Sequence, residues 1–101
     1  MQSGEESLQI LEYLFLHFQK TIQMKEMETE MKKKESLIER RARETFGRSI
    51  QELLEEIRIR IACSYLSATD RTVTQISSDV GFGSISSFQR SFSKYMNQTP
   101  S

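Results

Sequence analysis

A chain of 101 residues with 14 basic and 14 acidic side chains carries no net charge and has room for one domain, or for two very small ones that share a helix. No apolar run approaches the roughly 20 residues that a membrane span needs, so no membrane partner is expected. The single cysteine, Cys63, excludes an internal disulfide and forms no metal-ligand set with the lone His17. We therefore expect no metal, no cofactor and a reducing, cytoplasmic compartment.

Apolar residues at helical spacing predict two helices in the first third of the chain. Residues 1–6 are expected to be a flexible lead-in, after which Ser7 caps a largely buried helix that continues through Gln19. Thr21 is expected to cap a second helix, whose apolar positions are Met24, Met27 and Met31. Such a stripe favours a core position over a partner-binding surface.

The middle of the chain predicts two more helices. A third helix over 35–46 is followed by Gly47, a residue suited to a C-terminal stop. Ser49 then caps a long helix over 50–66. The second half of this helix is apolar on more than one side, which is typical of a linker packed against two subdomains.

Two short helices close the chain. Val73, Ile76 and Val80 mark the first of them, which ends at Gly81, a residue that accepts the positive φ of a tight turn. Either Ser84 or Ser86 caps the second. Its apolar stripe consists of Phe88, Phe92, Tyr95 and Met96, and residues 97–100 are expected to stop it.

The zero net charge hides a segregation of charge along the chain. Residues 1–31 carry two lysines against six glutamates, whereas residues 32–48 carry seven basic and three acidic side chains. Residues 49–57 are again acidic, and residues 58–101 carry five basic and two acidic groups. Phosphate contact requires a basic face rather than a basic protein, so the two basic blocks are compatible with nucleic-acid binding.

The segment from Val73 to Phe92 has the sequence pattern of a helix-turn-helix: a short helix, a glycine turn and a serine-capped helix with an aromatic stripe. This arrangement can hold one helix in a DNA groove. An enzyme is not expected, because the chain has no phosphate-cradling glycine loop and no paired acidic and nucleophilic residues at a suggestive spacing.

The C-terminal half resembles the AraC/XylS family of bacterial transcription regulators, whose DNA-binding domain consists of two helix-turn-helix units joined by a long helix. The elements that carry the resemblance are Arg58-Ile59, Ala62, Leu66, Ile76-Ser77, Gly81-Phe82, Phe88, Phe92 and Thr99-Pro100. The resemblance implies an all-α, homeodomain-like fold of about six to seven helices. It comprises a divergent first subdomain over 7–49, the linker helix over 50–66 and a second subdomain over 67–101.

The first subdomain departs from the family pattern at three places. Glu28 stands where the family has a small residue, Lys32–Lys34 replace a glycine turn and a serine cap, and Ala42 replaces an aromatic anchor. Loss of a cap costs about 1 kcal/mol, and an aromatic-to-alanine change in a core costs about 3–5 kcal/mol unless other side chains fill the space. Phe46 and the methionines are the candidates to fill it, so this subdomain is expected to be remodelled or looser.

Base contacts in the second subdomain follow from the geometry of a helix-turn-helix, in which the first residues of the second helix meet base edges. With Phe88 and Phe92 turned inward, the side chains that face DNA are Ile85, Ser86, Gln89 and Arg90. Arg90 can read a guanine bidentately, Gln89 can pair with an adenine, and Ile85 suits a thymine methyl.

The same geometry selects Ser36, Glu39 and Arg40 as base contacts of the first subdomain. Arg40 is the stronger reader, because Glu39 can only accept from a cytosine amine and would repel phosphate. Arg41 is expected to lie along the helix surface. The expected phosphate contacts are Lys34, Arg43, Ser84 and Lys94.

The resemblance implies further that the two reading helices enter successive major-groove segments of double-stranded DNA about 34 Å apart. It also implies an activator that recruits RNA polymerase to a promoter, and a fragment of a larger regulator whose effector acts elsewhere, so that no small-molecule ligand is expected here. The alternative left open is a helical protein-interaction module that uses the acidic, methionine-rich first half of the chain.

Overall fold

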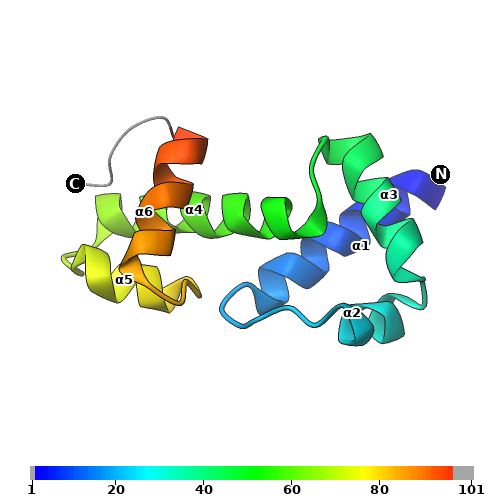
Figure 1. Ribbon diagram of the computed structural model, residues 1–101, viewed down its shortest axis with the longest axis horizontal. Helices are drawn as coiled ribbons and strands as arrows, with labels where there is room; N and C mark the ends of the chain where they lie inside the picture. The colour runs from blue at the N-terminus through cyan, green and yellow to red at the C-terminus, as the bar shows by residue number, and fades with distance from the viewer. Residues whose placement is uncertain (1, 97–101) are drawn as a thin grey trace. The chain divides into compact units, whose positions relative to one another are not determined.

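Six α-helices make up the computed structural model, which describes residues 2–96 and, from residue 4 onwards, their side chains (Figure 1). They are α1 (Gln2–His17), α2 (Met24–Met31), α3 (Glu35–Phe46), α4 (Ile50–Ala68), α5 (Val73–Asp79) and α6 (Ile85–Met96). No strand occurs within residues 2–96, so the prediction of an all-α fold is confirmed. Over the same range, no helix is long and apolar enough to cross a membrane. The chain divides into a first unit, Met1–Leu54, and a second unit, Glu55–Ser101.

The core of the first unit forms where α1 and α2 each pack against α3. Its buried apolar side chains come from these helices and from the first turn of α4: Ile10, Tyr13, Leu14, Met27, Met31, Ile38, Ala42, Ile50, Leu53 and Leu54. Met27 and Met31 therefore belong to the core, as their spacing predicted. Ala42 is fully buried, so the site of the missing aromatic anchor is closed by its neighbours.

The helix boundaries in this unit follow the local signals only in part. α3 spans the predicted residues, and its C-cap is Gly47, whose φ of 71° favours glycine. The prediction that Thr21 caps α2 is wrong. The N-cap position is Gln23, whose side chain makes no capping hydrogen bond.

α1 begins at Gln2, so the predicted flexible lead-in and helix start at Ser7 are wrong for the part of this segment that the structure describes. The helix also ends at His17 rather than at Gln19. Ser7 Oγ lies 2.7 Å from Thr45 Oγ1 of α3, and Arg41 Nε donates to Glu6 Oε1 at 2.6 Å. These contacts with α3, which local spacing cannot reveal, hold the turn around residue 6 in the helix.

Glu6 is the centre of an ion-pair cluster between α1 and the basic residues 32–48. Its largely buried carboxylate contacts Arg41 at 2.6 Å and Lys33 Nζ at 3.2 Å. The hydrogen bond from Arg41 lowers the pKa of Glu6 below its ordinary value of 4.5, burial opposes this shift, and Lys33 adds to it. Arg41 also contacts Glu44 at 2.9 Å, so its guanidinium lies along the unit's own surface, as expected.

Glu6→Gln should destabilise the first unit near neutral pH, and the deficit should shrink in acid. A carboxylate whose folded pKa is depressed stabilises the fold above its unfolded pKa, and this contribution is lost as the pH falls below about 4.5 through the folded value. Urea unfolding at about pH 7 and about pH 3 measures the difference, with Glu5→Gln at the exposed neighbouring position as the control. A deficit of equal size at both pH values would contradict the ion-pair account.

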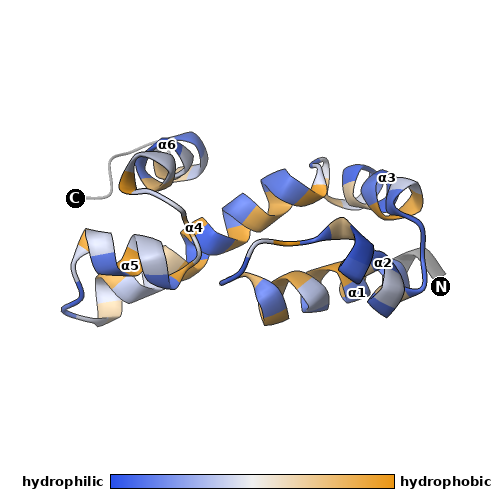
Figure 2. Ribbon diagram, turned by 60° about the horizontal axis from the view of Figure 1, so that its bottom comes forward, coloured by the Kyte–Doolittle hydropathy of each residue, from blue (hydrophilic) through white to orange (hydrophobic). Residues whose placement is uncertain are grey.

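Part of the apolar surface of α1 is not covered by any described residue. Leu8, Phe15 and Leu16 are 58%, 53% and 76% exposed, so the expectation that this helix is largely buried holds only for the face that carries Ile10 and Leu14. Figure 2 shows hydrophobic and hydrophilic bands side by side along α1. The first unit thus presents an exposed apolar face on this helix.

α4 begins with the predicted cap. Ser49 Oγ accepts the N–H of Glu52 at 3.1 Å, and Glu52 Oε1 accepts the N–H of Ser49 at 2.9 Å, which is a capping box. The helix ends at Ala68, slightly beyond the predicted Leu66. Burial raises the pKa of the half-buried Cys63 thiol, which agrees with its interpretation as a small apolar residue.

The second unit packs α5 against α6 and buries apolar side chains of α4 with them. Its buried apolar residues are Ile57, Ile59, Ala62, Ile76, Val80, Phe88 and Phe92. Thr72 and Gln75 form a capping box at the start of α5, which was not predicted from the sequence. The stop predicted at residues 97–100 lies outside the described residues.

Candidate nucleic-acid interface

α6 turns one side into the core and the opposite side outward. Phe88 and Phe92 are buried with their ring centroids 5.7 Å apart, and they fix which side of the helix faces inward. Ser86 and Arg90 lie on the opposite side, because positions four residues apart share a face of a helix with 3.6 residues per turn. The side chains expected to meet bases are all exposed in the first two turns, but Ile85, which is 36% exposed, lies on the same side as the phenylalanines, and Gln89 lies beside them.

Two serines organise the N-terminus of α6. Ser84 Oγ accepts the N–H of Ser87 at 3.1 Å, so Ser84 rather than Ser86 is the capping residue. Arg90 Nη2 donates to Ser87 Oγ at 3.4 Å, which holds the guanidinium near the start of the helix. Lys94, the remaining predicted contact, is exposed near the other end of α6, with its Nζ 5.1 Å from the centroid of the Tyr95 ring.

The turn between α5 and α6 is fixed by its backbone and by an aromatic contact. Gly81 has a φ of 100°, and the N–H of Phe82 donates to Ser77 O at 3.0 Å. The Phe82 ring packs edge-on against Phe88, with 5.5 Å between centroids, and lies 5.7 Å from the guanidinium carbon of the buried Arg58. Sequence reasoning placed Arg58 only in a family pattern, whereas the structure places it against the turn that sets the direction of α6.

α3 presents a second exposed polar row. Ser36, Arg40 and Arg43 are exposed and share one face of the helix, and the exposed Lys34 immediately precedes it. The neighbouring basic side chains, Lys33 and Arg41, are instead ion-paired with Glu6. The basic residues available to a ligand on this helix are therefore those that the sequence analysis selected.

Glu39 does not join this row. It is half-buried, and its Oε1 accepts the N–H of Ile50, the first residue of α4, at 2.9 Å. With the capping box of Ser49 and Glu52, it satisfies N–H groups that have no partner within the helix. Sequence reasoning missed this role because donor and acceptor stand eleven residues apart and belong to different helices.

Glu39→Ala should lower the free energy of unfolding of the first unit by about 1 kcal/mol, because it removes a cap from α4. Glu39→Gln should cost less, since an amide oxygen can accept the same hydrogen bond. Urea unfolding measures both, with Glu12→Ala at an exposed position of α1 as the control. Unchanged stability together with weakened duplex binding would show that Glu39 contacts bases and not α4.

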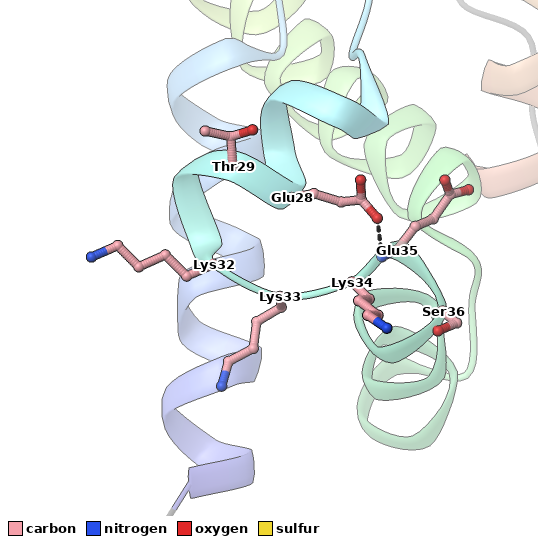
Figure 3. A pocket seen from close by; sticks show the side chains of 7 residues that line it. All are labelled: Glu28, Thr29, Lys32, Lys33, Lys34, Glu35 and Ser36. Atoms are coloured by element: carbon pink, nitrogen blue, oxygen red, sulfur yellow. Dashed lines mark hydrogen bonds between the residues drawn. The ribbon is translucent and has the colours of Figure 1, made fainter.

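The turn between α2 and α3 lacks the glycine and serine of the family that the chain resembles, and Glu28 compensates for the missing cap. Lys34 is the N-cap of α3, but its side chain makes no cap hydrogen bond. Glu28 Oε2 reaches from α2 and accepts the N–H of Glu35 at 2.5 Å (Figure 3). Lys32 adopts the left-handed conformation with a φ of 58°. The turn borders a surface pocket of about 620 Å³, lined by Glu28, Thr29, Lys32, Lys33, Lys34, Glu35 and Ser36.

Comparison with known sequences also indicates a helix-turn-helix protein. A family model described as a helix-turn-helix domain matches residues 27–101. An uncharacterized HTH-type transcriptional regulator of Staphylococcus aureus strain MSSA476 is 34% identical over 92 residues, which cover 91% of this chain and 12% of that protein. The chain therefore spans only a small part of the length of this relative.

Two solved structures share the fold at lower identity. An AraC-type transcriptional regulator from Chromobacterium violaceum matches with a TM-score of 0.90 at 18% identity, over 98% of this chain and 88% of that one. The DNA-binding domain of the global transcriptional factor AdpA, in complex with a target DNA, matches with a TM-score of 0.80 at 18% identity, over 90% and 82% of the two chains.

The fold, the two exposed helix faces and the family match define a helix-turn-helix domain of the DNA-binding regulator class. Within that class, the chain belongs to the AraC/XylS family and corresponds to its C-terminal DNA-binding domain. The resemblance inferred from the residues is thereby confirmed for the family and the fold.

Proposed function

We propose that this domain binds promoter DNA sequence-specifically by placing α3 and α6 in successive major-groove segments. The observation that carries the proposal is the row of exposed side chains in the first two turns of α6, on a helix whose Phe88 and Phe92 are buried: Ile85, Ser86, Gln89 and Arg90. Arg90 suits a bidentate contact to guanine and Gln89 a contact to adenine, while Ser86 and Ile85 adapt to the neighbouring base pair.

In the first unit, Ser36 and Arg40 are the proposed base contacts. Glu39 is left out, because its carboxylate is engaged with the start of α4. Phosphate contacts are assigned to exposed groups near the two recognition helices, namely Lys34, Arg43, Ser84 and Lys94. The α3 face thus contributes a higher density of positive charge than the α6 face.

The wider role proposed is that of the DNA-binding part of a larger bacterial regulator that acts in the cytoplasm and recruits RNA polymerase to a promoter. This wider role is inferred from the family and not from the geometry of the domain. The match to the staphylococcal relative covers only 12% of that protein, so most of such a regulator lies outside the region compared. The effector would act on another part of such a regulator.

A salt titration of duplex binding tests the proposed function. Each phosphate neutralised by a cationic side chain adds about −0.9 to the slope of log affinity against log salt. If only Lys34, Arg43 and Lys94 contact phosphates, raising the salt concentration from roughly 50 to 200 mM should therefore reduce duplex affinity about 40-fold. Absence of duplex binding at the lower salt concentration would exclude the proposed function.

The alternative function, a helical protein-interaction module, is favoured by one observation. Leu8, Phe15 and Leu16 are exposed on α1, whereas the residues proposed to contact DNA lie on or next to α3 and α6. Leu8→Ser and Phe15→Ser should leave the salt dependence of duplex binding unchanged if DNA binding is the function of the domain. Absence of duplex binding in the wild type would favour this alternative.

A further inference from the structure

One residue holds both ends of the turn between α2 and α3. The backbone carbonyl of Glu28 accepts the N–H of Lys32 and, at 3.2 Å, that of Lys33, which closes the C-terminal end of α2. The carboxylate of the same residue accepts the N–H of Glu35, the first residue of α3, at 2.5 Å. In Figure 3 the Glu28 side chain points across the turn to the backbone of Glu35.

The turn needs such a contact because its own residues do not stabilise it. Lys32 has a φ of 58°, a region that residues with a Cβ rarely adopt. Lys34 occupies the N-cap position with a suitable extended backbone, but a lysine side chain has no hydrogen-bond acceptor. A carboxylate at the N-terminus of a helix is stabilised by the helix dipole.

We propose that Glu28 is the positioning residue of the first recognition helix. Its carboxylate fixes the first turn of α3, and thereby the placement of Ser36 and Arg40 on DNA. Ser36 directly follows the capped residue, and Arg40 lies one turn further along the same face. The role rests on the proposed function, because it concerns how α3 reads base pairs.

A double-mutant cycle isolates the contact. Glu28→Ala removes the acceptor, and Glu35→Pro removes the donor. Proline is favoured at the first position of a helix, and Lys34 already has φ −74° and ψ 150°, which suit the residue before a proline. Glu28→Gln keeps an acceptor of similar length and is the conservative variant.

The first readout uses the domain without DNA. Glu28→Ala should accelerate hydrogen exchange at the Glu35 amide by about fivefold, the factor that corresponds to the loss of one cap. Glu28→Gln should restore most of the protection. An unchanged exchange rate in Glu28→Ala would show that the carboxylate does not hold α3 in solution and would overturn the proposal.

The second readout is base discrimination, which a merely structural role would not alter selectively. The base pairs read by α3 and by α6 are those whose preference is lost in Arg40→Ala and Arg90→Ala, respectively. Glu28→Ala should reduce discrimination at the α3 base pairs by about fivefold, in proportion to the lost cap, and leave the α6 base pairs unaffected. In the Glu35→Pro background, Glu28→Ala should cause no further loss.

Three outcomes would overturn the proposal at this stage. Glu28→Ala could raise affinity for all duplexes equally, which would mean that the carboxylate only repels phosphate. It could also lower stability with discrimination unchanged, or lower discrimination equally at both sets of base pairs. If the wild type shows no preference for any duplex, the proposed function fails as well, and amide exchange alone then reports whether Glu28 caps α3.

Discussion

Replacement of Phe88 by alanine should lower the free energy of unfolding of the second unit by about 3–5 kcal/mol. Phe88 is fully buried, and its ring contacts Phe82 edge-on and Phe92 at a centroid distance of 5.7 Å. Removing the ring leaves a cavity at the centre of a small core. Because small domains have a total stability of only about 5–15 kcal/mol, this loss is a large fraction of the whole.

Urea unfolding followed by circular dichroism measures the effect, and duplex binding should weaken in parallel because α6 loses its support. Ser93→Ala, at an exposed position on the same helix, is the matched control and should stay within about 0.5 kcal/mol of the wild type. Phe88→Leu should lie between the two. A loss below about 1 kcal/mol for Phe88→Ala would contradict the central place of this ring in the core.

Arg90→Ala should weaken binding to the preferred duplex by about 1–3 kcal/mol, or roughly 5- to 150-fold, and should flatten the preference at one base pair. The physical reason is the loss of the bidentate contact to a guanine edge that we propose for Arg90. Because Arg90 is exposed, the free energy of unfolding should hardly change. Compared with Arg90→Ala, Arg90→Lys should restore the positive charge but little of the discrimination between base pairs. A lysine lacks the planar guanidinium that donates two parallel hydrogen bonds.

Competition binding with duplexes changed at single base pairs measures this effect. Arg60→Ala is the control, because it removes the same charge from an exposed side chain of α4 that contacts Glu56. It should leave discrimination unaltered. A uniform loss of affinity across all duplexes in Arg90→Ala would make this residue a phosphate contact, and an unchanged affinity would remove it from the interface.

The helix boundaries that could be predicted from the sequence are those whose determinants are local. α3 was predicted over the residues that it occupies, since its apolar spacing and the following Gly47 act within a few residues of each other. The cap at Ser49 was likewise visible. The start of α1 was not, because the contacts of Glu6 and Ser7 with α3 join residues more than thirty positions apart.

The candidate site shows the same division. The spacing of Phe88 and Phe92 shows which side of α6 is buried. Helical periodicity was therefore sufficient to predict that Gln89 and Arg90 are exposed. Glu39 has an equivalent position on α3 by the same periodicity, yet its carboxylate is bound to the start of the next helix. Helical periodicity gives the face on which a residue lies, but not the hydrogen bond that its side chain makes with another element.

Selection of bound duplexes from a random pool tests directly whether α3 and α6 recognise a DNA sequence. We expect enrichment of duplexes with two blocks of preferred base pairs, about one helical turn apart. The preference in one block should be flattened by Arg90→Ala and in the other by Arg40→Ala. Recovery of a pool with no enriched sequence would contradict sequence-specific recognition by α3 and α6.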